Sequence, residues 1–363
     1  MKIAWLPGDG VGPEVLEATR LVLDKVGLDA EYIHGDIGWE FWCKEGNALP
    51  PRTVDLLHEV DAAMFGAITS KPAAVAKKEL EIEDRDFTYR SPIVRMRQFF
   101  DLYICKRPCK GYWGNRLNFC DAIDITVFRE NTEDLYCGIE FSPIPYGVTE
   151  GLDPYIKGHV PWGYNDAISI KVNTRQSSRR IVEAAFEYAK QNGKESVTVV
   201  HKANVVRATD GLFLEEARKV AENYPDIRLE DANVDAMCMW LLKNPLRYEV
   251  LVAPNLYGDI ISDLCAQMVG GLGFACSGNI GEKLGVFEPT HGSAPKYAGQ
   301  YKVNPIAAIL ASKMMLEWLG ENEKAEKIEG AVGAVIREGE VKTYDMGGDH
   351  TTLDMAKAIT ERM

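Results

Sequence analysis

The chain has 363 residues, of which 46% are hydrophobic and 26% charged, a composition typical of a globular protein long enough for two domains. Its formal net charge of −13 argues against nucleic acid or an anionic membrane as a partner, since both require a basic surface. The 8 cysteines form no CxxC pair, no apolar run approaches transmembrane length and no cleavable leader is visible, so we expect a cytoplasmic protein with reduced thiols.

Short apolar segments alternate with amphipathic stretches, the pattern expected of an α/β fold. We predict strands over the apolar segments 2–7, 62–68, 196–201 and 248–254, and helices over the amphipathic stretches 13–27 and 177–193. Gly8, Gly10 and Gly12 follow a G-x-G-x-G pattern with Pro13 next, whereas a Rossmann dinucleotide site requires G-x-G-x-x-G. We therefore predict a tight turn into a helix at that point. Residues 142–172, rich in Gly, Pro and aromatic side chains, predict a projecting arm or an oligomer contact.

Basic side chains gather in the stretch RSPIVRMRQFFDLYICKRP, although the chain as a whole is acidic. This stretch contains Arg97 and Arg107, and Arg129 follows at the end of the apolar run DITVF. One interpretation is a solvated basic helix face. The other is a site for a polyanionic small molecule, because the planar guanidinium group binds carboxylates at two points.

Three aspartates, one lysine and one loop are further candidates for a functional site. In NLYGDIISD, Asp259 and Asp263 lie about one helical turn apart, so they either cap a helix and face solvent or bind Mg²⁺ or Mn²⁺ together. Asp235 is a cap, a surface charge or a further ligand. Lys202, after the predicted strand SVTVVH, is either solvated or a base whose pKa is lowered in a cleft. The loop FEPTHGSAPKYAGQ could bind phosphate through backbone N–H groups and Lys296.

Taken in order, LPGDGVGPEV, FRENTEDLYCGIE, VVHKANV, NLYGDIISD, EPTHGSAPKYAGQ and KTYDMGGDHTT resemble the motifs of the metal-dependent, β-decarboxylating dehydrogenases, which include isocitrate, homoisocitrate and 3-isopropylmalate dehydrogenases. The resemblance covers nearly all of the chain. It implies an α/β fold of two domains with a mixed sheet, distinct from a Rossmann fold. Residues 1–102 and 271–363 would form a large domain, residues 103–270 a small one, and residues 137–174 a clasp between two subunits.

The same resemblance implies roles for individual residues in a homodimer with shared active sites. The substrate's carboxylates would be bound by Ser91, Arg97, Arg107 and Arg129. The catalytic pair would be Tyr136 and Lys202, the lysine coming from the other subunit. Mg²⁺ or Mn²⁺ would be held by Asp259 and Asp263, with Asp235 of the other subunit. The coenzyme would be bound by His291, Gly292, Lys296, Tyr297, Asn304 and Tyr344.

The implied reaction is oxidative decarboxylation of isocitrate to 2-oxoglutarate and CO₂. Lys296 and Tyr297 stand where NAD-linked relatives typically have Asp-Ile, which favours NADP, but Gly348 and Asn244 replace two arginines of NADP-linked enzymes, so NAD use is possible. Ser91 matches the isocitrate pattern. Ile93, however, stands where isocitrate enzymes often have an asparagine, and the segment SPIV is similar to that of homoisocitrate enzymes. The alternatives are homoisocitrate or 3-isopropylmalate dehydrogenase and, without catalysis, a regulatory subunit, although such subunits tend to lose the catalytic residues. No nicotinamide contacts are assigned in residues 66–90.

Overall fold

The computed structural model describes residues 1–82, 88–156 and 165–363. Its strands are β1 (Lys2–Gly8), β2 (Glu31–His34), β3 (Ala62–Ala67), β4 (Ile104–Lys110), β5 (Asp124–Glu130), β6 (Glu140–Phe141), β7 (Ile168–Ser169), β8 (Ser196–His201), β9 (Arg228–Asn233), β10 (Val250–Ala253), β11 (Cys276–Ile280) and β12 (Gly285–Pro289). Its α-helices are α1 (Gly12–Val26), α2 (Trp39–Glu45), α3 (Pro51–His58), α4 (Ala73–Lys78), α5 (Pro92–Phe99), α6 (Tyr146–Ile156), α7 (Arg175–Gln191), α8 (Thr209–Ala221), α9 (Val234–Lys243), α10 (Asn255–Met268), α11 (Ile306–Trp318), α12 (Asn322–Glu338) and α13 (Thr352–Thr360). Short 3₁₀ helices are η1 (Leu135–Cys137), η2 (Pro245–Arg247), η3 (Pro295–Tyr297) and η4 (Tyr344–Met346).

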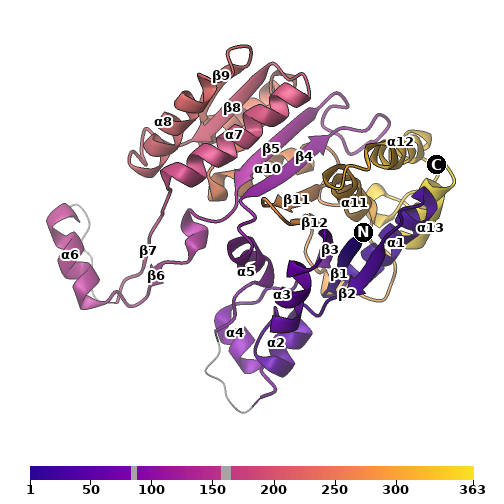
Figure 1. Cartoon of the computed structure of the whole chain (residues 1–363), viewed down its shortest axis with the longest axis horizontal. Coiled ribbons are helices and arrows are strands. Elements are labelled where there is room, and N and C mark those ends of the chain that lie inside the picture. The colour runs from indigo at the N-terminus through magenta and orange to yellow at the C-terminus, as the bar shows by residue number, and fades with distance from the viewer. Residues whose placement is uncertain (83–87, 157–164) are drawn as a thin grey trace.

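A 10-stranded mixed sheet runs through the molecule in the order β2-β1-β3-β12-β11-β4-β5-β10-β8-β9 (Figure 1). Strand β11 is antiparallel to both of its neighbours and β4 is antiparallel to β5, while the outer strands pair in parallel. The predicted α/β class and mixed sheet are confirmed. Strands from residues 1–102 and 271–363 occupy one half of the sheet and strands from residues 103–270 the other, joined where β11 pairs with β4.

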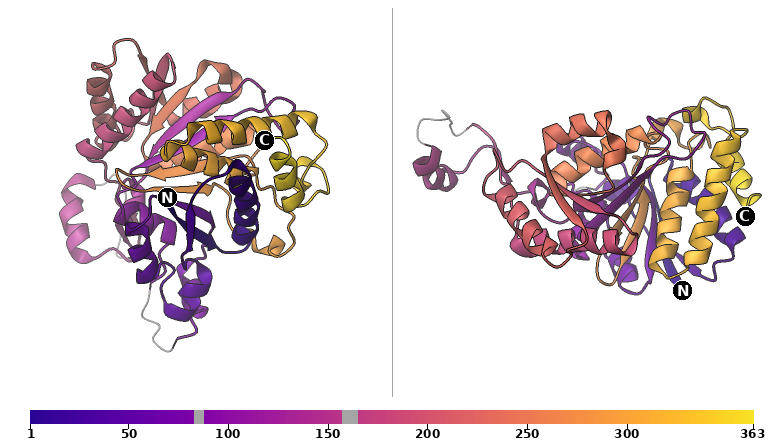
Figure 2. Two further views of the ribbon diagram at one scale, coloured as in Figure 1. Left: turned by 45° about the vertical axis from the view of Figure 1, so that its right-hand side comes forward. Right: turned by 90° about the horizontal axis from the view of Figure 1, so that it is seen from above.

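Helices cover both faces of each half of the sheet (Figures 1 and 2). In the first half, α1, α11, α12 and α13 form one core, and α3 and α5 pack on the opposite face. In the second half, α7 and α8 cover one face, whereas α9 and α10 cover the other. Strands β3, β8 and β10 are buried along their whole length, as expected for interior strands with helices on both faces.

The glycine-rich turn near the N-terminus joins β1 to α1 as predicted. Gly8 and Gly10 have φ values of 68° and 58°, in the left-handed region that favours glycine. A Cβ atom on Gly10 would lie 2.0 Å from the carbonyl oxygen of Ser293, so this turn also needs glycine for its close approach to a second loop. Pro13 lies in the first turn of α1, where its missing N–H group costs no hydrogen bond.

The predicted arm projects from the body of the molecule: β6 and β7 form a two-stranded antiparallel ribbon that carries α6 (Figures 1 and 2). Residues 157–164 of this segment, and residues 83–87 of the loop before α5, lie outside the described residues. None of the eight cysteines forms a disulfide. Over the described parts of the chain, no helix has both the length and the apolar character needed to cross a membrane.

Candidate active site

Helix α10 brings the aspartates of NLYGDIISD to the carboxyl end of β5. The helix begins directly after β10, whose residue Ala253 pairs with Arg129 at the end of β5. Gly258 makes the close approach possible, because a Cβ atom there would lie 2.7 Å from both Cβ and Cγ of Arg129. The glycine of this motif thus lets the helix rest directly on the strand and places Asp259 beside the guanidinium group of Arg129.

Asp259 is the centre of a cluster of charged and hydroxyl groups. Its Oδ1 atom accepts a hydrogen bond from Arg129 and another, of 3.2 Å, from Arg107. Its Oδ2 atom accepts a 2.6 Å hydrogen bond from the Tyr136 hydroxyl, and Arg107 also contacts Asp263 at 3.1 Å. Because α10 begins at Asn255, Asp259 lies in the second turn, and the interpretation of Asp259 as a helix cap is wrong.

Two arginines of the basic stretch are buried, so the interpretation of a solvated basic face is wrong for both. Arg97, on α5, donates to Asn279 at 2.9 Å and to Glu288 at 3.3 Å. Arg107, on β4, donates to Ser262 at 2.7 Å in addition to the two aspartates. Its Nε atom is buried and has no acceptor among the described residues. A buried donor without an acceptor is costly, and an anionic ligand would satisfy it.

The pKa shifts in this cluster show a field that favours anions. Burial would raise the pKa of Asp259, but the charges of Arg129 and Arg107 outweigh burial and hold it below its usual value. Burial, together with the like charges of Arg97 and Arg107, lowers the pKa of the Arg129 guanidinium group. Additional negative charge at this point would therefore be stabilised.

The other two groups of the cluster have raised pKa values. Burial raises the pKa of Asp263, which Arg107 counteracts only in part. Burial and the hydrogen bond to Asp259 raise the pKa of Tyr136, so its hydroxyl group stays protonated at neutral pH and is a hydrogen-bond donor.

Helix α5 presents two of the residues considered for substrate choice. Ser91 immediately precedes the helix, is half-buried, and its hydroxyl group makes no hydrogen bond with any described residue. Ile93 is buried in the core formed by α3, α5 and the neighbouring strands. The serine hydroxyl is thus available to a ligand, whereas the isoleucine contributes mainly to packing.

Lys202 and Asp235 form a separate pair. Lys202 follows β8, which is separated from β5 by β10, and its Nζ atom lies 2.5 Å from Asp235 at the start of α9. The hydrogen bond from Lys202 lowers the pKa of Asp235. Within the described chain, no hydrogen bond or ion pair connects these two residues to Asp259 or Tyr136. One chain therefore divides the predicted catalytic residues between two groups.

Exposed apolar side chains lie next to both groups. Helices α9 and α10 pack together, and they carry Met239, 53% exposed, and Ile260, 50% exposed, the latter adjacent to Asp259. Val205, three residues after Lys202, and Leu242 and Leu246 are exposed as well. Large apolar side chains gathered on one surface often mark a protein–protein contact.

Most of the predicted coenzyme residues line a cavity of about 370 Å³ at the carboxyl end of the first half of the sheet. It is bordered by His291, Gly292, Tyr297, Asn304 and Tyr344. The Nε2 atom of His291 is buried without a partner among the described residues, which leaves a polar group for a ligand to satisfy. Lys296 does not line the cavity, but its Nζ atom lies 4.7 Å from the ring centre of Tyr297.

Two charged residues of this cavity were not predicted from the sequence. Lys302 places its Nζ atom 4.2 Å from the ring centre of Tyr344. Asp345 accepts hydrogen bonds from Asn304 at 3.0 Å and from Thr343 at 2.5 Å. In the sequence, their only sign of a role at this cavity is that Lys302 lies two residues before Asn304 and Asp345 one residue after Tyr344.

Asp259 and Asp263 suit a hard divalent cation. Their side chains are 31% and 60% exposed, so carboxylate oxygens remain accessible beside the arginines. Mg²⁺ and Mn²⁺ are usually bound by one or two carboxylates, with the remaining positions filled by water or substrate oxygens. Among the described residues, no three His, Cys, Asp or Glu side chains converge on one point, so one chain supplies two carboxylates and not a complete set of protein ligands.

Comparison with known proteins agrees with this geometry. The family model "Isocitrate/isopropylmalate dehydrogenase" matches residues 2–360. The chain is 41% identical to 3-isopropylmalate dehydrogenase of Methanothermobacter thermautotrophicus, over 100% of this chain and 98% of that protein. It is 40% identical to protein DlpA of Legionella pneumophila over 99% of this chain, although it spans only 58% of DlpA's length.

A solved structure, that of isocitrate dehydrogenase from Methylococcus capsulatus, superimposes with a TM-score of 0.88 at 38% identity, covering 99% of this chain and 98% of that one. These relatives share a family but differ in the substrate they are named for. The fold, the motifs and the matches together show that this chain belongs to the isocitrate/isopropylmalate dehydrogenase family.

Proposed function

We propose that this protein catalyses the oxidative decarboxylation of isocitrate to 2-oxoglutarate and CO₂, with NADP as the favoured coenzyme and Mg²⁺ or Mn²⁺ as the metal. The observation that carries the proposal is the cluster at Asp259, where two arginines and a tyrosine hydroxyl converge on a carboxylate that is still partly exposed. Such a cluster binds a polycarboxylate and places an acid beside it. Residues 1–102 with 271–363, and residues 103–270, are the two proposed domains.

The arginines would bind the substrate and orient it. Arg97, Arg107 and Arg129 offer guanidinium donors for its carboxylates, including the unsatisfied Nε atom of Arg107. Ser91 would donate its free hydroxyl group to the carboxylate that distinguishes isocitrate from 3-isopropylmalate. Burial of the arginines strengthens these contacts, because surrounding water is reduced.

Lys202 would accept the proton of the substrate hydroxyl during oxidation, and Tyr136 would donate a proton to the carbon from which CO₂ has departed. The Tyr136 hydroxyl is held in place by Asp259 at 2.6 Å. A bound nicotinamide coenzyme would supply the hydride acceptor, and a cation held by Asp259 and Asp263 would supply positive charge beside the substrate oxygens. Proton, hydride and CO₂ are thereby all accounted for.

A homodimer would complete this site. Asp235, which is paired with Lys202, lies four residues before the exposed Met239 on α9, and α9 packs against α10, which carries the exposed Ile260. A second copy docked on α9 and α10 would bring its own Lys202 and Asp235 towards Asp259. Burial of these side chains between two copies would also explain why a globular protein exposes them. The arm with α6 would provide a further contact between subunits.

Lysines at the edge of the coenzyme cavity support NADP. Lys296 and Lys302 place two ammonium groups beside Tyr297 and Tyr344, which suits a 2′-phosphate. Asp345, however, keeps lone pairs that could accept ribose hydroxyl groups, the interaction typical of NAD. This mixture of charges agrees with NADP as the favoured coenzyme and with NAD as a second one.

The test is the initial rate of NADPH and, separately, NADH formation with Mg²⁺, using isocitrate, homoisocitrate and 3-isopropylmalate. We expect isocitrate with NADP to give the highest kcat/KM. Preference for homoisocitrate or 3-isopropylmalate would contradict the role given to Ser91 while leaving the metal-dependent reaction intact. No turnover of any of the three would contradict the proposed function and favour a binding subunit.

A further inference from the structure

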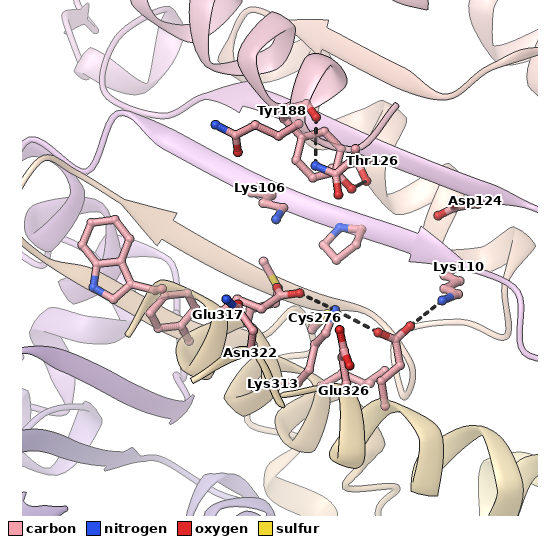
Figure 3. A pocket seen from close by; sticks show the side chains of 18 of the residues that line it. Lys106, Lys110, Asp124, Thr126, Tyr188, Cys276, Lys313, Glu317, Asn322 and Glu326 are labelled. Atoms are coloured by element: carbon pink, nitrogen blue, oxygen red, sulfur yellow. Dashed lines mark hydrogen bonds and ion pairs between the residues drawn. The ribbon is translucent and has the colours of Figure 1, made fainter. Parts of the chain in front are cut away.

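A cleft with a volume of about 820 Å³ lies on the side of the sheet away from the Asp259 cluster. Strands β4 and β5 and helix α7 form one wall, and helices α11 and α12 form the other (Figure 3). The cleft therefore lies between the two halves of the molecule, on one face of the sheet that joins them. Its volume is in the range of small-molecule sites, roughly 300–1,000 Å³.

Alternation along the strands explains why this cleft is distinct from the proposed active site. Successive side chains of a strand point to opposite faces of the sheet. On β4, Lys106 and Lys110 line the cleft, whereas Arg107 between them points to Asp259. On β5, Thr126 lines the cleft and Arg129 points the other way. The two sites therefore share strands but no side chains.

One cation in the cleft takes part in no ion pair with a described residue. The charged residues that line it are Lys106, Lys110, Asp124, Lys194, Lys313, Glu317, Glu326 and Glu329. Three of the four lysines are paired: Lys110 lies 2.5 Å from Glu329, Lys313 lies 2.8 Å from Glu317, and Lys194 lies 2.6 Å from Asp124.

Lys106 makes no ion pair or hydrogen bond with any described residue. Its ammonium group lies 4.6 Å from the ring centre of Tyr188 (Figure 3). Burial lowers the pKa of this group, with the neighbouring Lys313 adding to the effect and Glu317 opposing it. A bound anion would stabilise the charge that burial penalises.

A hydroxyl donor lies on the same wall. The hydroxyl groups of Thr126 and Tyr188 are 3.1 Å apart and hydrogen-bonded to each other (Figure 3). Only one of their two hydrogens can lie in that bond, so the pair retains one donor for a ligand. Two part-exposed aromatic side chains, Tyr112 and Trp318, also line the cleft, and behind them lie the buried side chains of Phe274, Phe287, Leu310 and Met314.

We propose that this cleft binds a small organic anion with an apolar body, whose carboxylate or phosphate group contacts Lys106 and the hydroxyl groups of Thr126 and Tyr188. The unpaired ammonium group would supply the charge complement, and the part-exposed rings of Tyr112 and Trp318 would contact the body of the ligand. The ligand would lie against the reverse side of the strands that carry Arg107 and Arg129. This inference does not depend on the proposed reaction.

The test uses benzoate as an anionic probe and benzamide as its neutral counterpart of the same shape, each titrated into the full-length protein by isothermal titration calorimetry. We expect wild-type protein to bind benzoate with a Kd near 1 mM and benzamide at least about tenfold more weakly. Lys106→Met, which removes the charge but keeps the length of the side chain, should weaken benzoate binding at least about tenfold.

Two variants serve as controls. Lys106→Arg keeps the charge and should bind benzoate like wild type, as should Lys25→Met, which removes an exposed lysine of α1 outside the cleft. Thermal unfolding should show that Lys106→Met is folded, because removing a buried charge does not leave a cavity. Three results would overturn the proposal. Benzoate binds Lys106→Met as tightly as wild type, which includes binding at the arginines around Asp259; benzamide binds wild type as tightly as benzoate does; or wild type does not bind benzoate.

Discussion

The Asp259 cluster and the Lys202–Asp235 pair differ in how each balances its charge within one chain. Asp259 contacts two buried arginines on β4 and β5 and the half-buried Tyr136 in the segment after β5, and each contact is made by the same chain. Asp235 is 67% exposed in its side chain and has one partner, and apolar side chains beside it face solvent. Under the proposed homodimer, the first group is one half of a site and the second completes the site of another copy.

The largest expected effect comes from removing one catalytic group in each region. Tyr136→Phe and Lys202→Ala should each reduce kcat by about 10²–10⁴-fold, the usual contribution of a general acid or base. Circular dichroism and thermal unfolding should remain close to wild type, since neither side chain belongs to a core cluster. Lys25→Ala is the matched control for the loss of a lysine. Full turnover in either variant would remove the role proposed for that residue.

Placing charges among the exposed apolar side chains of α9 and α10 should impair the function of the Asp259 cluster and of the Lys202–Asp235 pair together. Two separate variants, Ile260→Glu on α10 and Met239→Glu on α9, each place a charge on this surface. Each should convert the proposed dimer into monomers with little turnover, because a monomer would lack the second half of its site. Mass by light scattering and activity are measured on the same samples. The control is Leu21→Glu on α1, a side chain 39% exposed that lies elsewhere. A monomeric variant with full activity would contradict the divided site.

The geometry of the buried cluster depends on Gly258. Gly258→Ala would place a Cβ atom 2.7 Å from Arg129, whose Cβ and Cγ atoms cannot move aside without moving β5. We expect a loss of roughly 1–3 kcal/mol in the free energy of unfolding and reduced kcat from a displaced Asp259. Gly330→Ala is the matched control, since α12 has open space around Gly330, and it should gain about 0.5–1 kcal/mol. Equal stability of the two variants would contradict the close contact.

The smallest effect concerns Glu133, in the segment that joins β5 to Tyr136. Burial raises the pKa of Glu133 to about 7 from about 4.5. A carboxyl group with a higher pKa in the folded state binds more protons there, so its contribution to the free energy of unfolding, roughly 1–3 kcal/mol, is present below pH 4.5 and lost as the pH rises to about 7.

Glu133→Gln imitates the protonated acid and should flatten the dependence of Tm on pH in this window, while Glu222→Gln, at an exposed position, should keep the slope of wild type. An unchanged slope in Glu133→Gln would show that Glu133 is ionised in the folded protein.

The sequence alone supports the α/β class, the glycine turn after β1 and the position of Arg129 at the end of a strand. Local pattern suffices for these features, because apolar periodicity and glycine spacing are properties of neighbouring residues. The proximity of Tyr136, Arg129 and Asp259 was expected only from the family motifs, since they come from segments far apart in the chain. The burial of Arg97 and Arg107 could not be foreseen, because it arises when α5 and β4 pack against distant segments.

Residues that act through tertiary contact were also missed. Lys302 and Asp345 reach the coenzyme cavity from different segments, and neither forms a motif by itself. Lys106 and Arg107 appear in sequence as one basic patch, but the strand directs them to opposite faces. Assignment of neighbouring charges to separate sites requires knowledge of the strand and its orientation.

The central claim is that each active site combines Tyr136 and Asp259 of one chain with Lys202 and Asp235 of another. It is tested most directly by mixing Tyr136→Phe and Lys202→Ala proteins, unfolding and refolding them together, and measuring turnover of the preferred acid. Half of the dimers would be mixed and each would contain one intact site, so the account predicts recovery to about a quarter of wild-type activity. Activity that stays at the level of the separate variants, with mixed dimers demonstrated by mass, would contradict it.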